Sequence, residues 1–313
     1  MAETSFWHKV DKTLRHHQRR AQVWLRDAAW PLFRMRDCRP LFIVGCSRAG
    51  TTLVYKTFSE SVALGSLQRE THDFWAALHP PAAIGWKSHA VAAELATPEE
   101  ADRIARHFYA ETGHQRWVDK NNQGGLSIPY LLRLFPRAHF VYVKREPGDN
   151  VNSLIEGWMR PDEFATWSQQ LPGEVALEQG RLRQWCFFLA EGWEAYRHAS
   201  VEAVCAFQYQ AMNQAILTAR DAVDPRQWSE IHYEALVDDP VGGFRTLFES
   251  CDLPFDAAMA HHCATVLKRP YNAFSPIGVE KWRGSRFADK VERVLPPEMP
   301  QNTLEPGSSL PAR

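Results

Sequence analysis

Short apolar runs alternate with stretches of helical spacing along the middle of the chain. Apolar, β-branched and aromatic runs predict buried strands at residues 41–44, 116–120, 138–144 and 228–233. Apolar residues recur with helical spacing over residues 53–62, 98–112, 128–135, 240–251 and 256–268. Strands that alternate with helices usually form a mostly parallel sheet that is covered on both faces. The pattern therefore predicts an α/β fold.

Residues 181–222 are also predicted to be largely helical. Their aromatic residues are expected to mark the sides that face the core: Trp185, Phe188, Trp193 and Tyr196. The preceding residues 160–180 have no clear periodicity and contain two prolines and Gly173. We therefore expect a variable loop or lid between the two regular parts of the chain.

The two ends of the chain differ from its middle. Residues 1–37 place apolar and aromatic residues among basic ones, which predicts one or two amphipathic helices. We expect this N-terminal extension to pack on a main domain of residues 38–295 or to form an oligomer contact, although such helices can also lie on a membrane surface. Residues 296–313 are rich in proline, serine and glycine and predict a flexible tail.

Composition narrows the possible functions. The 36 basic and 37 acidic residues give a net charge of −1, which argues against a general nucleic-acid-binding protein. No apolar stretch is long enough for a transmembrane helix, and no signal-peptide core follows the basic N-terminus, so we expect a cytoplasmic protein. The six cysteines form no CxxC pair, which predicts buried thiols in a reducing compartment and no metal site.

The strongest functional signal lies in residues 40–53, which read PLFIVGCSRAGTTL. A buried strand enters a turn that contains Gly45 and Gly50, and the chain leaves through Thr51 and Thr52 into a helix. Turns of this shape bind phosphate because backbone N–H groups converge at a helix N-terminus that carries partial positive charge. The alternative is a strand-to-helix turn that binds nothing.

This turn differs from the ATP-binding Walker A loop in one position. The two glycines keep the Walker spacing, but Thr51 stands where the Walker lysine would be. The only cation of the turn is Arg48, two residues before the second glycine. The turn therefore predicts an anion site that differs from that of the ATP-binding proteins.

A second anion site is predicted where the strand at 138–144 ends. Arg145 follows this strand, and Ser153 lies eight residues later near the start of a helix that Asp149 or Asn150 is expected to cap. A guanidinium and a hydroxyl placed in this way can hold one phosphate from two sides. Ligands of open α/β sheets bind at the carboxyl ends of the strands, so both turns should face one crevice. In the alternative, Arg145 pairs with Glu146 or Asp149 and Ser153 faces solvent.

The two turns and their surroundings resemble one known family. Residues 135–154, which run Phe-Pro-x-Ala-x-Phe-Val-Tyr-Val-x-Arg-x-Pro and later Asp and Val-Asn-Ser-Leu, are similar to the 3′-phosphate-binding region of sulfotransferases that use 3′-phosphoadenosine 5′-phosphosulfate (PAPS). The similarity extends to residues 42–53, 118–120 and 228–236, and it is strongest to bacterial and tyrosylprotein sulfotransferases. The resemblance implies a P-loop nucleotide-kinase-like fold with a central, mostly parallel sheet, PAPS as co-substrate and no metal.

The resemblance also implies roles for individual residues. It assigns the 5′-phosphosulfate to the first turn: Arg48, Ala49, Gly50, Thr51 and Thr52. It assigns the remaining nucleotide contacts to later residues: Arg145 and Ser153 for the 3′-phosphate, Tyr233 for the nucleotide, and Lys281 and Arg283 in a loop that closes over it. Ala49 stands where the family usually has serine, which removes a hydroxyl and leaves the backbone N–H.

Sulfuryl transfer needs stabilised charge on the leaving phosphate and a base for the acceptor. Arg48 is placed for the first task, and the resemblance adds Lys120. Glu70 falls where the tyrosylprotein enzymes carry an acidic residue and is our first choice as base. His72 is a rival, because imidazole titrates near neutrality and cytosolic sulfotransferases use histidine.

Non-catalytic roles stay open for several of these residues. Glu70 could pair with Arg69, and His72 could cap or pack. Asp73 is expected to cap a helix, and Asp119 could pair with its neighbour Lys120.

The sequence leaves the acceptor open among carbohydrate, lipid, small-metabolite and peptide hydroxyls or amines. The 160–180 segment and the N-terminal helices are expected to shape its pocket, and Trp75 and Trp86 are candidates for stacking on it. Two other functions compete with sulfuryl transfer: a P-loop nucleotide kinase or NTPase, and a catalytically silent module that binds PAPS or phosphate. The missing Walker lysine and the lack of a clear acidic magnesium partner count against the first.

Overall fold

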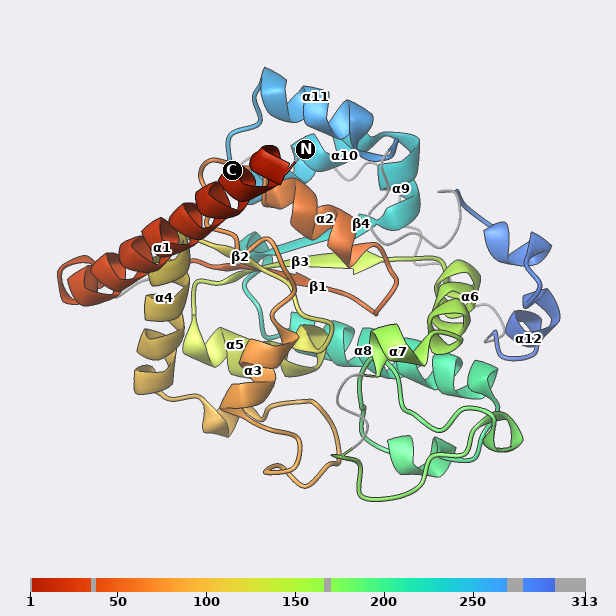
Figure 1. Ribbon diagram of the computed structural model, residues 1–313. Coiled ribbons are helices and arrows are strands. Elements are labelled where there is room, and N and C mark those ends of the chain that lie inside the picture. The colour runs from red at the N-terminus through yellow and green to blue at the C-terminus, as the bar shows by residue number, and fades with distance from the viewer. Residues whose placement is uncertain (1, 35–37, 166–169, 269–277, 296–313) are drawn as a thin grey trace, which may run out of the picture.

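A four-stranded parallel sheet forms the centre of the molecule (Figure 1). The computed structural model describes residues 2–34, 38–165, 170–268 and 278–295, with side chains described from residue 17 onward. The strands lie in the order β2-β1-β3-β4, and every neighbouring pair is parallel. Their bounds are Leu41–Val44 for β1, Val118–Asp119 for β2, His139–Lys144 for β3 and Trp228–His232 for β4. The predicted α/β fold with a mostly parallel sheet is confirmed.

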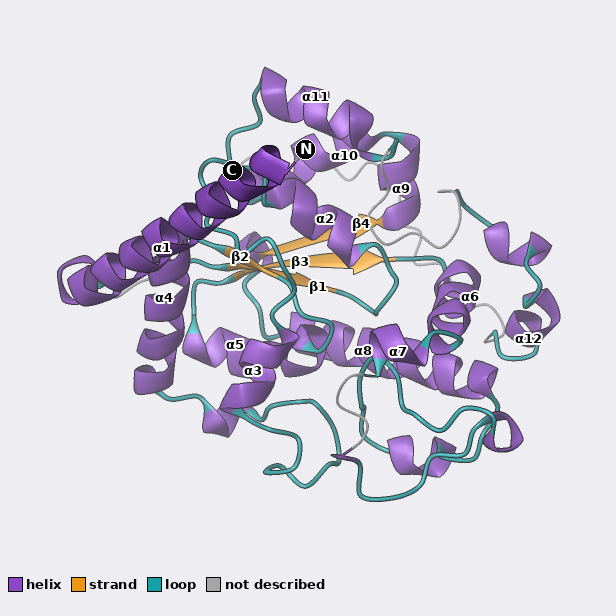
Figure 2. Cartoon of the chain, viewed as in Figure 1, coloured by secondary structure: helices purple, strands orange, loops and turns teal. Residues whose placement is uncertain are grey.

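Both faces of the sheet are covered by helices (Figure 2). Alternate side chains of each strand enter different cores, so that Phe42 and Val44 pack into one and Leu41 and Ile43 into the other. On the first face lie α3 (His72–Leu78), α4 (Pro98–Thr112), α5 (Ile128–Leu134), α6 (Pro147–Trp158) and α8 (Val201–Arg220). On the second face lie α2 (Thr51–Phe58), α9 (Tyr233–Asp238), α10 (Pro240–Ser250) and α11 (Ala257–Val266).

Shorter elements complete the described chain. Two are α-helical, α7 (Pro161–Phe164) and α12 (Ala288–Glu292). The others are 3₁₀ turns: η1 (Ala93–Leu95), η2 (Gly124–Ser127), η4 (Glu178–Gly180), η5 (Trp193–Tyr196), η6 (Pro225–Gln227) and η7 (Lys281–Gly284). The expected tail at 296–313 lies outside the described residues.

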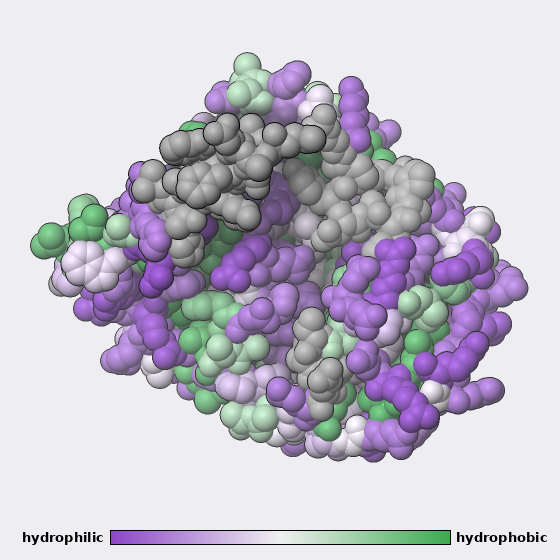
Figure 3. Space-filling view, in the orientation of Figure 1, coloured by the Kyte–Doolittle hydropathy of each residue, from purple (hydrophilic) through white to green (hydrophobic). Residues whose placement is uncertain are grey.

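The N-terminal extension is one helix, α1 (Ala2–Phe33), which lies along α4. Trp30 is buried between them, with its ring tilted against that of Tyr109, and donates its indole N–H to Asp102 at 3.1 Å. Hydrophobic atoms gather at the left-hand end of the molecule in Figure 3, where α1 ends. Trp24 and Leu32 are exposed side chains of this helix. No helix within the described ranges combines the length and apolarity that a bilayer span requires.

The prediction of a long helix over residues 181–222 is wrong for its first half. The helix begins only at Val201, and residues 181–200 follow an irregular path with Gly192 in a left-handed conformation. Trp185, Phe188 and Trp193 are nevertheless buried, and Tyr196 is partly buried. The indole of Trp185 donates to the carbonyl of Phe188, and that of Trp193 to the carbonyl of Trp86. The spacing of the aromatic residues resembled that of a helix, but these residues are buried by tertiary contacts of an irregular segment.

Candidate active site

The phosphate-type turn lies at the carboxyl end of β1, where the chain enters α2. Gly50 precedes the helix with φ 98°, and a Cβ there would lie 2.3 Å from the ring of Tyr233. The ring of Tyr233 therefore lies directly against the turn. The first N–H groups of α2 have no acceptor within the helix, so they are donors for an anion. The N–H of Ala49 differs, because it donates to the carbonyl of Cys46 at 3.1 Å.

Arg48 is the cation of this turn and adopts a left-handed backbone conformation with φ 70°. Its Nε donates to the hydroxyl of Ser153 at 3.4 Å, and its guanidinium lies 5.7 Å from the ring centre of Phe164. Burial, and then the charge of Arg145, lower the pKa of Arg48 to about 10. An anion between the two arginines would favour their charged forms.

The turn after β3 holds the first turn in place. Arg145 donates from Nη1 to the carbonyl of Arg48 at 2.8 Å, and Asn150 donates from Nδ2 to the carbonyl of Ser47 at 2.9 Å. The guanidinium of Arg145 also lies 4.7 Å from the ring centre of Tyr233. The structure thus brings the two predicted anion sites together, as the rule for open sheets requires.

Several expectations about the second turn need correction. Glu146 caps α6, accepting bonds from the backbone N–H groups of Gly148 and Asp149, so neither Asp149 nor Asn150 is the cap. Arg145 bonds to the carbonyl of Arg48 in the first turn, whereas the alternative expected it to pair with Glu146 or Asp149. Ser153 is only 9% exposed and does not face solvent.

Glu70 and Lys120 form an ion pair beside the first turn. Lys120 Nζ lies 2.6 Å from Glu70 Oε1, and the hydroxyl of Thr52 donates to the same oxygen at 3.2 Å. Burial opposes ionisation of Glu70, but the Lys120 charge and these hydrogen bonds outweigh it and lower the pKa of the carboxyl. The expected alternative partner of Glu70, Arg69, is not the one it takes. Glu70 thus contacts both the ammonium group of Lys120 and the hydroxyl of Thr52.

Asp119 is buried behind this pair and does not pair with Lys120 as the alternative supposed. Its oxygens accept from the hydroxyl of Thr71 at 2.6 Å and from the indole of Trp75 at 2.8 Å. Trp75 is therefore a buried residue that fixes α3 to the end of β2. Trp86 is partly buried in the loop that precedes α4, where its carbonyl accepts from Trp193.

His72 is the first residue of α3 and follows Glu70 by two positions in the sequence. Its Nε2 is 3.3 Å from Asp73 Oδ1, and its Nδ1 is buried without a hydrogen-bond partner. Asp73 lies in the first turn of α3, and Thr71 occupies the cap position, so the expectation that Asp73 caps this helix is wrong. Nothing in these contacts links His72 to the phosphate-type turn, whereas Glu70 bonds to it directly.

A narrow pocket of about 390 Å³, mouth included, opens beside α3 and α5. Its lining is mixed, with Trp75 and Leu131 on the apolar side and His89 and Asn121 on the polar side. His89 accepts from the backbone N–H of Leu189 through Nδ1 at 2.7 Å, and burial lowers its pKa to about 3. A neutral His89 thus carries its proton on Nε2.

The predicted closing loop forms η7, which lies on the N-terminal end of α6. The backbone N–H of Trp282 donates to Asp149 Oδ1 at 3.0 Å. Burial and the charge of Arg145 lower the pKa of Lys281, so this lysine lies within the field of the second turn. Arg283 is exposed and its guanidinium lies against the ring of Trp282, 4.6 Å from the ring centre.

Sequence reasoning missed Asn150, Phe164 and the capping role of Glu146. The first two act through contacts with residues more than a hundred positions away, which local spacing does not reveal. Across the segments that the structure describes, no three His, Cys, Asp or Glu side chains gather as a metal site would require.

The sequence profile of the sulfotransferase family matches residues 40–214 and 179–257, which contain both turns and the Glu70–Lys120 pair. The chain belongs to the sulfotransferase family. No curated protein sequence matches it.

The chain is also similar to solved sulfotransferase structures. Sulfotransferase STF9 from Mycobacterium avium is similar with a TM-score of 0.51 and 17% identity, over 87% of this chain and 81% of that one. Sulfotransferase STF1 from Mycobacterium tuberculosis gives a TM-score of 0.44 and 15% identity, over 83% and 80%. A mouse sulfotransferase complexed with PAP gives 0.40 and 12%, over 82% and 81%. The first likeness shows the P-loop-like sulfotransferase fold, as the resemblance implied.

Proposed function

We propose that this protein transfers the sulfuryl group of PAPS to a hydroxyl or amine of an acceptor. The observation that carries the proposal is the direct joining of two anion-binding turns by the Arg145–Arg48 and Arg48–Ser153 hydrogen bonds. A nucleotide with phosphate groups on both its 3′ and 5′ positions suits two such sites on one sheet edge. Family membership supports the same reaction class.

The 5′-phosphosulfate is proposed to bind the first turn. The N–H groups of Gly50, Thr51 and Thr52 at the start of α2 are its donors, together with the guanidinium of Arg48. The N–H of Ala49 is engaged by Cys46, so Ala49 contributes by leaving room more than by donating.

The 3′-phosphate is proposed to bind Arg145 and Ser153, with Lys281 close enough to add its charge. Tyr233 lies on Gly50 and beneath Arg145, where its ring supports both turns and can contact the nucleotide. Arg283 would have to leave Trp282 to reach the ligand.

In the proposed reaction the acceptor oxygen or nitrogen attacks the sulfur atom in line with the leaving phosphate. The new bond to sulfur forms as the bond between sulfur and the 5′-phosphate oxygen breaks, and the acceptor proton passes to a base. The products are the sulfated acceptor and 3′-phosphoadenosine 5′-phosphate (PAP). Arg48 and Lys120 would stabilise the charge on the phosphate, each contributing on the order of 10²–10³ in rate.

Glu70 is the base that we propose, because it is ionised and hydrogen-bonded to the first turn. A carboxylate with a lowered pKa is a weak base. We therefore propose that Lys120 shifts its ammonium group from Glu70 toward the leaving phosphate during transfer, which restores the basicity of Glu70. Replacing Lys120 with methionine tests this exchange: the transfer rate should fall about a hundredfold while PAP still binds, and an unchanged rate would rule the exchange out.

Nucleotide binding separates this function from the P-loop kinase alternative. Thermal unfolding is measured with PAP, with ATP and with ATP plus magnesium. We expect PAP to raise the melting temperature most and magnesium to add nothing to the effect of ATP. A larger stabilisation by ATP with magnesium would overturn the proposal.

Transfer of labelled sulfate from PAPS to panels of sugars, lipids, small phenols and amines, and peptides tests catalysis itself. Glu70→Gln serves as the inactive control, and Lys120→Met as a slowed variant. If the wild type binds PAP and sulfates none of these acceptors, the silent binding module becomes the better account.

A further inference from the structure

The C-terminal segment of residues 278–295, which we name the strap, is docked on α6. Trp282 and Val291 are its buried anchors, and both belong to the core on the first face of the sheet. The Trp282 indole covers Gly148, where any Cβ would lie 2.3 Å from its nitrogen. Because the predicted second anion-binding turn leads into α6, docking of the strap brings Lys281 into the electrostatic field of Arg145.

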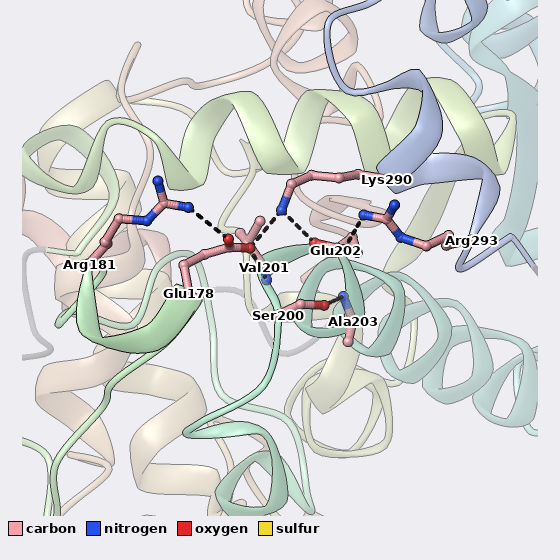
Figure 4. Close-up of polar contacts among 8 residues, drawn as sticks. All are labelled: Glu178, Arg181, Ser200, Val201, Glu202, Ala203, Lys290 and Arg293. Carbon is pink, nitrogen blue, oxygen red and sulfur yellow. Dashed lines mark hydrogen bonds and ion pairs between the residues drawn. The ribbon is translucent and has the colours of Figure 1, made fainter.

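An ion network holds the far end of the strap (Figure 4). Lys290 Nζ lies 2.7 Å from Glu178 Oε1 and 2.8 Å from Glu202 Oε2. Arg293 Nη2 lies 2.8 Å from Glu202 Oε1. Each carboxylate thus meets a cation of the strap, although Glu178 and Glu202 themselves belong to the loop before α8 and to its first turn.

The network also joins the last residues of the variable loop to the start of α8. Glu178 accepts a further bond from the backbone N–H of Val201 at 3.0 Å and pairs with Arg181 at 3.2 Å (Figure 4). The same helix start is capped by Ser200, which accepts from the N–H of Ala203 at 3.4 Å. Strap, loop and helix therefore share one set of contacts.

Lys290 separates two carboxylates that would otherwise face each other. Hydrogen bonds from Lys290 and Arg293 outweigh burial and lower the pKa of Glu202 to about 2, and the pKa of Glu178 is also lowered. Lifting the strap would leave two like charges side by side at the start of α8. This repulsion favours the docked strap.

We propose that Lys290 and Arg293 are positioning residues, whose ion pairs with Glu178 and Glu202 hold the strap over the nucleotide site and couple it to residues 174–182. The inference rests on the proposed function, because it treats the strap as part of the PAP site. Bound nucleotide then stabilises the strap, the strap stabilises the loop, and by reciprocity an ordered loop strengthens nucleotide binding. Residues 174–182 and the nucleotide site thereby form one coupled unit.

Dissociation of PAP is measured by stopped-flow tryptophan fluorescence for the wild type, Lys290→Met, Arg293→Gln and Glu202→Gln. We expect each substitution to speed dissociation about fivefold or more, with little change in the association rate. High salt should speed dissociation from the wild type and have less effect on the variants. Asp224→Asn is the control, because it removes a surface ion pair with Arg226 that lies outside the strap and α6.

Amide hydrogen exchange provides a second measurement. The protection that PAP gives to residues 174–182 would not change if the substitutions only lowered the overall stability. PAP should slow exchange in residues 174–182 of the wild type, and this protection should be lost in Lys290→Met and in the more exposed Arg293→Gln. Equal protection in the variants, or unchanged PAP dissociation, would overturn the inference. Failure of the wild type to bind PAP at all would instead overturn the proposed function.

Discussion

Arg48 combines three properties that together suit it to a developing negative charge. Its backbone is left-handed, its guanidinium lies between Ser153 and Phe164, and its pKa is lowered to about 10 by burial and by Arg145. A cation that is already desolvated and fixed in position needs little reorganisation when charge appears nearby. At the residue scale, this pre-set position distinguishes Arg48 from an exposed arginine.

Removing the guanidinium should therefore affect transfer more than binding. We expect Arg48→Ala to lower kcat by about 10²–10³, with a smaller rise in the dissociation constant of PAP, because backbone N–H groups remain. Arg48→Lys should recover part of the rate. Steady-state kinetics with PAPS and calorimetry with PAP measure the two effects. A loss confined to PAP affinity would show that Arg48 only binds.

The choice between Glu70 and His72 can be made from pH dependence. Because the pKa of Glu70 is lowered, its carboxylate becomes protonated only when the pH falls below the ordinary glutamate range. If Glu70 is the base, the enzyme should lose kcat/KM only below about pH 4.5. Histidine ordinarily titrates near pH 6.5, and a histidine base would place the limb there. We expect Glu70→Gln to abolish transfer and His72→Ala to leave most of it. The reverse pattern would assign the base to His72.

At the scale of elements, the phosphate-type turn depends on its neighbours as much as on its own sequence. Asn150 of α6 and Arg145 at the end of β3 bond to its carbonyl groups, and the first residue of α9, Tyr233, lies on Gly50. Two segments far from the turn in sequence, the β3–α6 connection and the start of α9, thus fix it. Its shape is a tertiary property.

Gly50→Ala should disrupt this assembly. The new Cβ would meet the Tyr233 ring at 2.3 Å and would also sit at φ 98°, so we expect lower stability and at least tenfold weaker PAP binding. Gly85→Ala is the matched control, because its φ is 81° but no atom lies within 4 Å. The control should cost only about 1–2 kcal/mol of backbone strain and leave PAP binding unchanged. Similar PAP affinities in both variants would contradict the role given to the Tyr233 contact.

Sequence patterns predicted the sheet and the turn because both depend on local runs. The apolar strand, the glycines and Thr51 are contiguous, and their pattern specifies a strand-to-helix turn. Residues 181–200 were mispredicted because aromatic spacing reports burial and leaves the backbone path undetermined. The partners of Asn150 and Asp119 depend on contacts between distant segments, which one sequence does not contain.

At the scale of the whole molecule, the N-terminal helix and the candidate site lie on opposite sides. In Figure 1 α1 and α4 occupy the left of the sheet, whereas α6 and α12 occupy the right. Arg19 of α1 and Arg34, which directly follows α1, pair with Glu111 and Asp102 of α4, although both arginine side chains stay more than half exposed. The buried Trp30 bonds α1 to α4, which favours packing as the role of this helix.

One substitution in α1 should therefore lower the stability of the protein without changing its affinity for PAP. Trp30→Ala removes a buried ring and its bond to Asp102, and we expect a loss of about 3–5 kcal/mol in the free energy of unfolding. PAP affinity of the folded protein should stay unchanged. Trp24→Ala, at a side chain that is 68% exposed, should change stability by less than about 0.5 kcal/mol. Denaturant unfolding and calorimetry measure both, and a fall in PAP affinity in Trp30→Ala would show that α1 reaches the site.

The strand order also determines when the phosphate-type turn can form during synthesis. β1 occupies the interior of the sheet, yet Leu41 pairs with Val118 on one side and with His139 on the other. The turn is complete only after Tyr233, which packs against Gly50, has also been synthesised. It is therefore among the first segments to leave the ribosome and among the last to take shape, with an apolar strand exposed in the interval. Nascent chains shorter than about 233 residues should depend on chaperones to keep that strand from aggregating.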